Sequence, residues 1–229
     1  MTGTKMQTRI YIADVHCLNE KKLFAKYYAA VNKERRAKVD RMRFQKDKIL
    51  SLGVEILLQR ACKDFGIEYN DASIAENEYG KPYFKDIDLA FNLSHSGERA
   101  MCIMSEELVG CDVEEIDTPD LQILSFFSAE ERAQILALKN DDSLADYFYR
   151  LWTLKESFVK CAGAGLEIDL TDFTVRIHSD YVELKQSITK DVYFIGECHL
   201  NDNYRYAWCR RKSGGETEIK PLINFYSLL

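Results

Sequence analysis

The stretch LWTLKESFVK, Leu151–Lys160, sets two lysines and a glutamate among apolar residues. On a helix, Trp152, Glu156 and Lys160 recur at every fourth position and share one face, which adjoins the apolar stripe of the same helix. A glutamate four residues before a lysine is also an ordinary exposed helix pair, which stabilises a helix by about 0.2–0.5 kcal/mol. Taken alone, this stretch predicts either a solvated helix face or a charged site at the border of the core.

Two further carboxylates occur in VGCDVEE, which alternates like a β-strand. Asp112 and Glu114 then point to one face of the strand, and Cys111 points to the other. Adjacent carboxylates repel each other unless water or a cation separates them, and Glu156 offers a third carboxylate on a helix. Three oxygen donors with room for water suit Mg²⁺, which usually also binds substrate phosphates. A D-x-E pair by itself is weak evidence, because many solvated strands carry one.

Two other stretches carry groups that suit an anion. In GKPYF, Lys81 precedes Pro82 in a tight turn, a geometry that can hold a point charge against a phosphate. In FNLSHSG, Ser94, His95 and Ser96 stand at a strand end before a glycine, where hydroxyl, imidazole and amide groups can converge. Each stretch has a plainer explanation, since Lys-Pro turns are common and a single histidine is usually structural. Together they indicate a phosphorylated ligand.

The order GKPYF, FNLSHSG, VGCDVEEI, LWTLKESFVK resembles the 4′-phosphopantetheinyl transferases of the surfactin-synthetase type. These motifs span about residues 80–165, and DRMRFQKDKILSLGVEILLQR extends the likeness toward the N-terminus. The resemblance implies an α+β fold with two pseudo-symmetric halves in one chain, residues 1–108 and 109–229, and an active site at the junction between them. It also implies a monomer, in contrast to the short trimeric acyl-carrier-protein synthases.

The family moves the 4′-phosphopantetheine arm of coenzyme A to a serine of an apo carrier protein and releases adenosine 3′,5′-bisphosphate. The resemblance therefore implies coenzyme A as the substrate, an acyl or peptidyl carrier protein as the partner and Mg²⁺ as the cofactor. It leaves open whether the carrier belongs to fatty-acid, polyketide, peptide-synthetase or lysine biosynthesis.

The resemblance also assigns site residues, motif by motif. Asp112, Glu114 and Glu156 are the implied Mg²⁺ ligands, and either Glu156 or Glu114, directly or through water, is the base for the serine proton. Lys160, with a catalytic role, and Lys155 are expected near the pyrophosphate. The other expected contacts to coenzyme A are Lys81, Pro82, Ser94, His95, Lys38 for the 3′-phosphate, and Ser51 near the adenine.

The elements that must position these groups follow from the hydrophobic pattern. Strands are predicted at 9–15, 74–79, 88–93, 99–105, 109–116, 173–178, 181–186, 192–199 and 204–210. Helices are predicted at 19–31, 34–43, 47–66 with Gly66 as its end, from the capping box Ser128…Glu131, and from Ser143 to Gly163. Helices mixed with short hairpin strands favour the α+β class over a doubly wound sheet.

Composition bounds the remaining possibilities. The chain has 229 residues, of which 46% are hydrophobic, enough to bury one large core or two small ones. Its seven cysteines lack metal-ligand spacing, so we expect neither a zinc site nor a disulfide framework. No apolar stretch is long enough for a signal peptide at the N-terminus or for a membrane span elsewhere. We therefore expect a cytoplasmic protein without a membrane or nucleic-acid partner.

Charge is distributed unevenly behind the net value of −6. Residues 1–60 carry 14 Lys and Arg against 6 Asp and Glu, and the basic residues are densest in the stretch Lys33–Lys48. This stretch is either a solvated helix face or a surface for a phosphorylated ligand or an acidic partner.

Two other functions use part of the same residues. A Mg²⁺-dependent nuclease or phosphohydrolase would use Asp112, Glu114 and Glu156 but would leave the GKP and SHS stretches without a role. A non-catalytic module that binds coenzyme A or a carrier protein would not need the carboxylates. Magnesium-dependent turnover of coenzyme A separates the three hypotheses.

Overall fold

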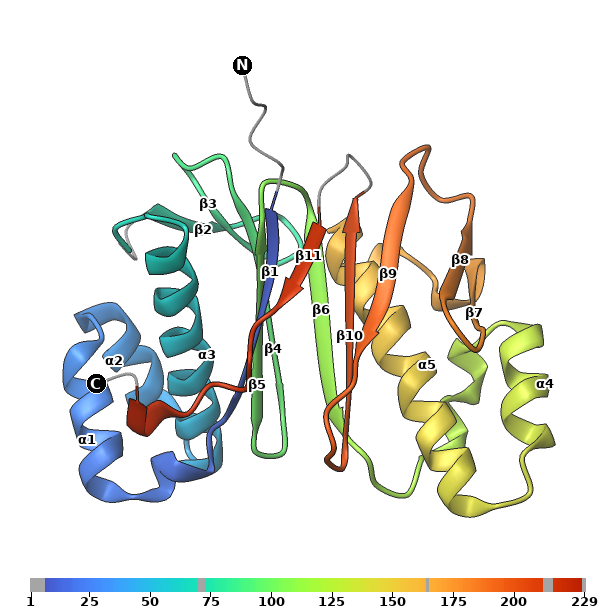
Figure 1. The fold of residues 1–229 in the computed structure, drawn as a ribbon, viewed down its shortest axis with the longest axis horizontal. Helices are drawn as coiled ribbons and strands as arrows, with labels where there is room; N and C mark the ends of the chain where they lie inside the picture. Colours follow the sequence, from blue (N-terminus) through green and yellow to red (C-terminus); the bar gives the residue numbers. More distant parts are fainter. Residues whose placement is uncertain (1–6, 70–72, 164, 212–215, 228–229) are drawn as a thin grey trace.

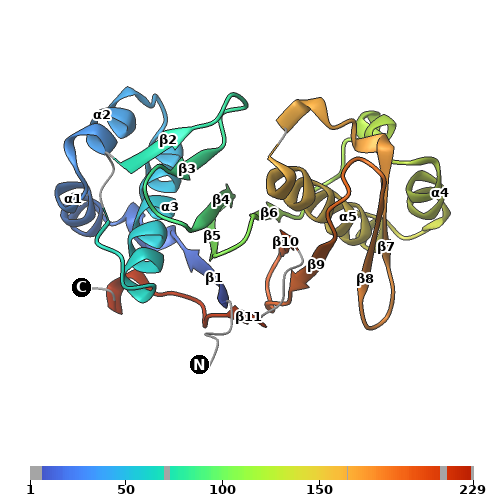
Figure 2. The same cartoon turned by 90° about the horizontal axis from the view of Figure 1, so that it is seen from above.

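The computed structural model describes residues 7–69, 73–163, 165–211 and 216–227. Helices lie on the two outer sides of the molecule, and two sheets lie between them (Figure 1). The first sheet has the strand order β11-β1-β5-β4, and the second has the order β6-β10-β9. The sheets adjoin where β4 of the first meets β6 of the second (Figure 2).

The N-terminal half contains the strands β1 (Gln7–Asp14), β2 (Ile74–Glu76), β3 (Pro82–Phe84), β4 (Ala90–Ser96) and β5 (Arg99–Ser105). Its helices are η1 (His16–Asn19), α1 (Lys21–Ala30), α2 (Lys33–Arg41) and α3 (Gln45–Asp64). The C-terminal half contains β6 (Val109–Glu115), β7 (Phe173–Ile177), β8 (Val182–Gln186), β9 (Tyr193–Cys198) and β10 (Tyr204–Arg211). Its helices are η3 (Leu121–Phe126), α4 (Ala129–Ala137), α5 (Asp141–Ala162), η4 (Gly165–Glu167) and η5 (Leu170–Asp172). The strand β11 (Glu216–Ile219) and the short helix η6 (Phe225–Ser227) end the described chain.

The two halves repeat one connectivity. Each begins with a strand, continues through helices and a two-stranded sheet, and ends with a hairpin whose second strand pairs with the first strand. The corresponding sheets are β1-β5-β4 and β6-β10-β9. The α+β class and the two pseudo-symmetric halves are therefore confirmed.

Three hydrophobic cores hold these layers together. One lies between α3 and the first sheet, and a second lies between α5 and the second sheet. The third lies between the two sheets and takes residues from both halves, including Ile10, Met101, Val113 and Tyr206. Each sheet is therefore covered on both faces, and the core between the sheets makes the hydrophobic interior continuous across the two halves.

Most predicted elements are present with small shifts at their ends. The capping box of α4 is formed by Ser128 and Glu131, and α5 begins two residues before the predicted Ser143, after an Asn140 cap. Gly66 and Gly163 have φ values of +73° and +76°, which suits the glycines that end α3 and α5. The strands β3 and β11 were not predicted, because each is short and lies next to turn residues.

The last strand departs from the predicted division of the chain at residue 108. β11 pairs in parallel with β1 of the N-terminal half, from Gln7 opposite Glu216 to Ile10 opposite Ile219. Beyond it, the buried Phe225 joins the N-terminal core, where its carbonyl accepts a hydrogen bond from the Tyr27 hydroxyl. The C-terminal end of the chain thus belongs structurally to the first half, although residues 109–211 do form the second.

Polar side chains of β4 connect it to β6. Asn92 Oδ1 accepts a hydrogen bond from the backbone N–H of Cys111 at 2.9 Å. Ser94 Oγ accepts from Val113 at 3.4 Å, and Ser96 Oγ accepts from the next alternate residue of β6 at 3.2 Å. The period of two along FNLSHS therefore directs three side chains toward the neighbouring sheet.

In the described part of the chain, every helix is too short or too polar to cross a membrane.

Candidate active site

A cavity of about 350 Å³ lies where β4, β6 and α5 meet. Its lining contains most of the polar residues that the sequence motifs singled out, together with two apolar side chains. These residues are Leu93, Ser94, His95, Asp112, Glu114, Trp152, Glu156 and Lys160. Three motifs that lie up to about 65 residues apart in the sequence are thus brought together at the junction of the halves.

The alternation of β6 produces the predicted division of its side chains. Cys111 and Val113 point into the core between the sheets, whereas Asp112 and Glu114 point to the side of α5. The strand can approach this helix closely because of Gly110. A Cβ atom there would stand 2.1 Å from the backbone oxygen of Ser157, so any side chain would force strand and helix apart.

Lys160, from the last turn of α5, makes an ion pair with Asp112. The distance from Nζ to Asp112 Oδ1 is 2.6 Å, and Ser94 Oγ lies 2.8 Å from the same oxygen and 3.3 Å from the ammonium. Burial lowers the pKa of Lys160, but the Asp112 carboxylate outweighs burial and holds this pKa above its usual value. Lys160 therefore stays charged at the cavity wall.

Glu114 and Glu156 carry the remaining carboxylates. Burial raises the pKa of Glu114, and so does the neighbouring charge of Asp112, although the hydroxyl of Ser96 donates a 2.7 Å hydrogen bond to it. Burial also raises the pKa of Glu156, against the opposing effect of Lys160. The cavity thus concentrates negative charge that the described protein groups neutralise only in part.

His95 lies at the exposed side of the cavity. The surrounding protein lowers its pKa, chiefly by desolvation, with a smaller effect from Lys160. A neutral imidazole at neutral pH can donate one hydrogen bond and accept another. It can therefore donate to an unprotonated phosphate oxygen or accept from a hydroxyl group.

Lys155 is not at this site, and the prediction for it is wrong. Its side chain is 1% exposed, and Nζ lies 2.8 Å from Glu131 Oε2, 3.0 Å from the carbonyl of Phe173 and 4.1 Å from the centre of its ring. Glu131 itself caps α4 and accepts from the backbone of Val175. The position of Lys155, next to Leu154 on the apolar stripe, was the available signal for this inward direction.

Three other residues expected to contact coenzyme A do not line the cavity either. Lys81 places its ammonium on backbone carbonyls at the end of α5, and Pro82 follows it in β3. Ser51 is 4% exposed within α3, so it offers no open surface for an adenine. The contacts of Lys81, Pro82 and Ser51 with coenzyme A therefore stay predictions that the lining of the cavity does not support.

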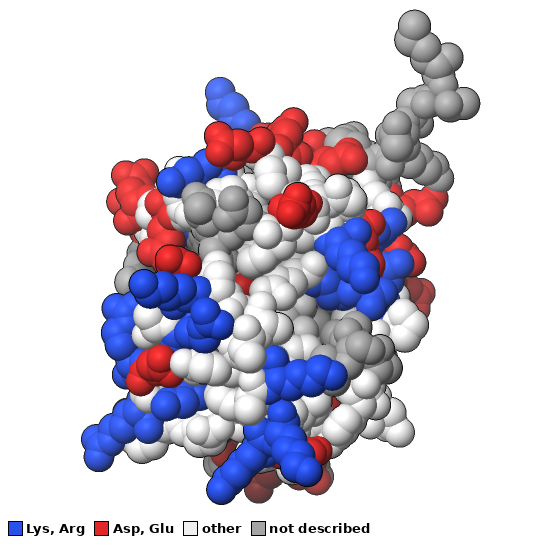
Figure 3. All heavy atoms as spheres, turned by 90° about the vertical axis from the view of Figure 1, so that its left-hand side faces the viewer, with Lys and Arg blue, Asp and Glu red and all other residues white. Residues whose placement is uncertain are grey.

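Lys38 lies apart from the cavity on the exposed face of α2. Lys and Arg side chains are spread widely over this side of the molecule (Figure 3). Its contact with a 3′-phosphate stays a prediction.

Sequence reasoning missed one polar residue that shapes the site, Asn92, which fixes the position of β6 beside β4. It could have been found by extending the alternation from Ser94 two residues back along the strand. Ser96, which was expected to face a ligand, instead holds Glu114. Trp152, recognised on the face of Glu156 but given no role, forms an apolar wall of the cavity.

Volume alone does not identify the functional site. A larger hollow, of about 600 Å³, lies near the start of α5 and is lined by several aspartates, among them Asp117 and Asp142. Its Arg205 is paired with Asp146, and no buried side chain without a hydrogen-bond partner lines it within the described residues. The smaller cavity carries the converging lysine, serine, histidine and carboxylates, which is the chemically informative set.

Comparison with protein families matches residues 19–107 to the description "4′-phosphopantetheinyl transferase, N-terminal" and residues 108–209 to the 4′-phosphopantetheinyl transferase superfamily. A 4′-phosphopantetheinyl transferase of Bacillus subtilis is 35% identical over 185 residues, which cover 79% of this chain and 82% of that protein. The 4′-phosphopantetheinyl transferase Sfp of Bacillus subtilis (strain 168) is 32% identical over 208 residues, covering 89% and 92%. The 4′-phosphopantetheinyl transferase gsp of Aneurinibacillus migulanus is 32% identical, covering 78% and 76%.

Family models match both halves, and the residues that they match, 19–107 and 108–209, include all of those that line the cavity. Relatives above 30% identity align with most of the chain. The chain belongs to the 4′-phosphopantetheinyl transferase family.

Proposed function

We propose that this protein transfers the 4′-phosphopantetheine arm of coenzyme A to a serine of an apo acyl or peptidyl carrier protein. In this reaction the serine oxygen forms a bond to the β-phosphorus of coenzyme A. The bond from that phosphorus to the bridging oxygen breaks, and adenosine 3′,5′-bisphosphate leaves. The observation that carries the proposal is the convergence of three carboxylates, Lys160 and the Ser94–His95 pair on one cavity between the halves.

The residues of the cavity divide the work of this reaction. Lys160 offers positive charge and hydrogen bonds to phosphate oxygens, and the neutral His95 offers a hydrogen bond. Ser94 keeps Lys160 and Asp112 together. Glu156 is the proposed base for the serine hydroxyl, because burial raises its pKa toward the range of a useful base. Glu114, whose pKa is raised by burial and by Asp112, is the alternative base.

Mg²⁺ is the proposed cofactor. Within the described residues, no three His, Cys, Asp or Glu side chains are grouped closely enough to enclose a metal ion. The donor chemistry nevertheless fits a hard cation that keeps water and phosphate ligands, since Asp112 Oδ2 is buried without a hydrogen-bond partner beside Glu114 and Glu156. Asp112, Glu114 and Glu156 would hold Mg²⁺, which when bound supplies positive charge against the pyrophosphate.

The nucleotide end of coenzyme A is proposed to extend from the cavity toward the basic face formed by α1 and α2. Lys38 is the proposed partner of the 3′-phosphate, and its exposed ammonium is available for a charge-assisted hydrogen bond. We further propose that the protein acts as a monomer, because one chain supplies both halves of the junction. A cytoplasmic location stays a prediction.

The direct test is mass spectrometry of several apo-carrier proteins after incubation with the protein, coenzyme A and Mg²⁺. A phosphopantetheine mass increment on a serine is expected, and it should disappear when EDTA replaces Mg²⁺. The Glu156→Gln variant should lose roughly 10²-fold or more in kcat while its KM for coenzyme A changes much less. Exposed Glu106 is a suitable control position. A folded Glu156→Gln protein that modifies carriers at the wild-type rate would contradict the assignment of this residue.

A further inference from the structure

The turn of the β2–β3 hairpin contacts the chain that ends and follows α5. Three side chains of the turn reach across from the N-terminal half to the C-terminal half, and we call this set the clasp: Asn77, Tyr79 and Lys81. Asn77 Nδ2 donates to the carbonyl of Gly163 at 3.1 Å, and the Tyr79 hydroxyl donates to Glu167 Oε2 at 2.8 Å. In Figure 2 the hairpin turn and the segment after α5 point toward each other.

Lys81 makes the most extensive contacts of the clasp. Its ammonium donates to the carbonyl of Val109 at 2.9 Å, to the carbonyl of Lys160 and, at 3.4 Å, to that of Cys161. These are the first residue of β6 and the last turn of α5, where the helix dipole is negative and carbonyls lack helical partners. An ammonium has three N–H donors, and these three carbonyls accept from all of them. The side chain that was expected to bind a phosphate is therefore already fully hydrogen-bonded within the protein.

The hairpin turn is built to hold this lysine in place. Asn77 Oδ1 accepts from the backbone N–H groups of Tyr79 and Lys81 at 3.0 and 2.9 Å, which closes the turn. Gly80 has a φ of +78°, which few other residues would adopt there. Tyr79 lies against Gly165, since a Cβ atom on that glycine would stand 3.1 Å from the Cβ of the tyrosine.

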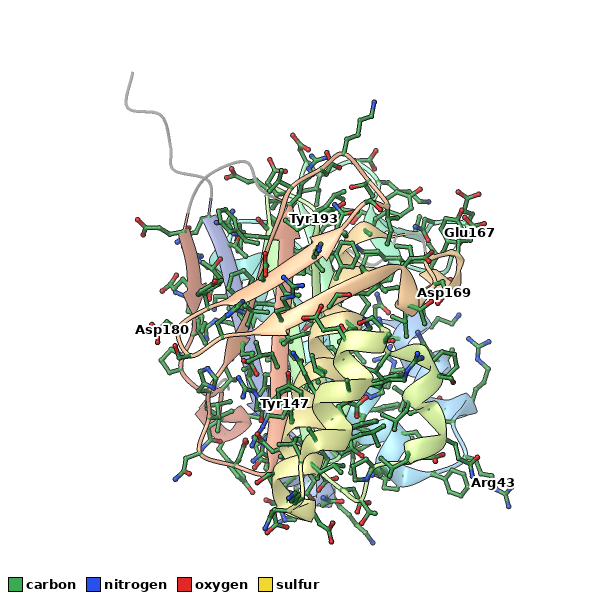
Figure 4. The ribbon with its side chains drawn as sticks, turned by 90° about the vertical axis from the view of Figure 1, so that its right-hand side faces the viewer. Arg43, Tyr147, Glu167, Asp169, Asp180 and Tyr193 are labelled. Carbon is green, nitrogen blue, oxygen red and sulfur yellow. The ribbon has the colours of Figure 1, made fainter. Side chains whose placement is uncertain are left out.

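Glu167, the partner of Tyr79, lies on the segment after α5, close to Asp169 (Figure 4). The clasp therefore grips three successive parts of this segment: the last helical turn, the glycine that ends the helix, and the short helix η4. All three belong to the half that supplies Glu156 and Lys160 to the cavity.

Lys160 connects the clasp to the cavity. Its backbone oxygen accepts from Lys81, while its own ammonium lies 2.6 Å from Asp112. We infer that Lys81 is a positioning residue, and that the clasp fixes the last turn of α5 across the junction so that Lys160 and Glu156 keep their reactive arrangement. This inference rests on the proposed transfer reaction and replaces a direct phosphate contact for Lys81 by an indirect role.

The two roles predict different kinetics. A residue that binds coenzyme A in both ground and transition states chiefly affects KM when it is removed. A positioning residue affects the rate of the chemical step, because small displacements of reacting groups cost large factors in rate. The other clasp residues, which do not line the cavity, should then share the phenotype of Lys81.

The test compares Lys81→Met, Asn77→Ala and Tyr79→Phe with the control Lys85→Ala, which removes an exposed lysine at the end of the same hairpin. For each protein, kcat and KM for coenzyme A are measured with one apo-carrier well below the melting temperature. Hydrogen–deuterium exchange of residues 157–163 is followed in parallel. Lys81→Met should lower kcat roughly 10-fold or more and speed exchange in this segment, with KM changed by no more than about twofold.

Tyr79→Phe, the mildest change, should shift kcat and exchange in the same direction by smaller factors, and Lys85→Ala should leave both at wild-type values. A raised KM with unchanged kcat in Lys81→Met alone would overturn the inference in favour of a phosphate contact. Faster exchange with unchanged kcat and KM would also overturn it, since the contact would then be only structural. Failure of the wild-type protein to modify any carrier would instead count against the proposed function, and the exchange data would still report on the clasp.

Discussion

At the scale of single residues, neighbouring charges on α5 have unrelated tasks. Lys155 turns inward to Glu131 in the C-terminal core, whereas Glu156 and Lys160 face the cavity. The rotation of about 100° per residue separates adjacent side chains on a helix, so one position decides between the core and the site. Similar residue types in one motif therefore contribute either to stability or to chemistry, depending on the face they occupy.

Replacement of Lys155 tests the first of these tasks. A lone Glu131 carboxylate would remain buried in Lys155→Met, so we expect a loss of about 3–5 kcal/mol in the free energy of unfolding. The double variant Lys155→Met/Glu131→Gln should recover part of this loss, because it removes the uncompensated charge. Urea denaturation measures both changes, and kcat per folded molecule should stay near the wild-type value. A single variant as stable as the wild type would show that the pair contributes little.

Replacement of Glu156 has an opposite effect on stability, with a defined pH dependence. Burial raises the pKa of this carboxyl above its unfolded value, so the folded state binds more protons than the unfolded state only at pH values between the two pKa values. As pH rises through the unfolded pKa, the unfolded state ionises first and stability falls; above the folded pKa the loss is complete. Glu156→Gln removes this loss and should melt at a higher temperature than the wild type.

The difference in melting temperature between Glu156→Gln and the wild type, measured in EDTA, should grow from about pH 4 to pH 7. Glu106→Gln, at an exposed position, serves as the control and should show no such trend. A Glu156→Gln protein that melts below the wild type at pH 7 would mean that the carboxylate stabilises the fold, contrary to its raised pKa.

At the scale of elements, the β4–β6 contact, which we call the seam, both joins the two halves and forms one wall of the active site. Alternate residues of β4 accept hydrogen bonds from β6 by their side chains, so this contact differs from ordinary strand pairing through the backbone. Ser94 and Ser96 use the same oxygens to hold Asp112 and Glu114. Joining the halves and orienting the carboxylates are thus done by the same two residues.

Asn92 and Ser96 should separate these two roles. Asn92→Ala leaves the buried N–H of Cys111 without its acceptor, so we expect a loss of about 1–3 kcal/mol in stability and little change in kcat. Ser96→Ala removes the hydrogen bond that holds Glu114, so kcat should fall several-fold. Its loss of stability should be smaller than that of Asn92→Ala, because Glu114 is more exposed than the N–H of Cys111. Denaturation curves and steady-state rates on the same preparations give both quantities. If Asn92→Ala instead lowers kcat and Ser96→Ala chiefly lowers stability, the two roles are not divided between these residues in this way.

At the scale of the whole molecule, the chain returns to its first half after completing the second. β11 covers the outer edge of β1, and Phe225 fills part of the core near Tyr27. In the described structure the edge of the first sheet opposite the cavity is therefore occupied by the chain itself, while the β4 edge remains beside β6. The two pseudo-symmetric halves consequently differ in what covers their sheets.

Phe225→Ala should reveal this dependence of the first half on the last segment. Truncation of a fully buried phenylalanine typically costs about 3–5 kcal/mol, because it leaves a cavity. Hydrogen–deuterium exchange should rise first in β1 and α1 and later, or not at all, in α5. Tyr226→Phe, which alters the exposed neighbour, is the matched control. Equal loss of protection in both halves would indicate that they unfold as a single unit.

Features that depend on local periodicity and on motif order were predictable from the amino-acid sequence alone. The face of β6 that carries Asp112 and Glu114, the face of α5 that carries Glu156 and Lys160, and the capping box of α4 are all set by backbone geometry within a few residues. The order of four motifs was sufficient to indicate the family, as the relatives confirm.

Which of these groups meet, and which do not, depends on contacts between elements far apart in the sequence. The inward direction of Lys155, the capping of α5 by Lys81, the seam formed by Asn92 and Ser96, and the return of β11 each depend on a partner more than 15 residues away. Local sequence fixes the direction of a side chain relative to its own element, but the free energy of burial and pairing across elements decides what that side chain contacts.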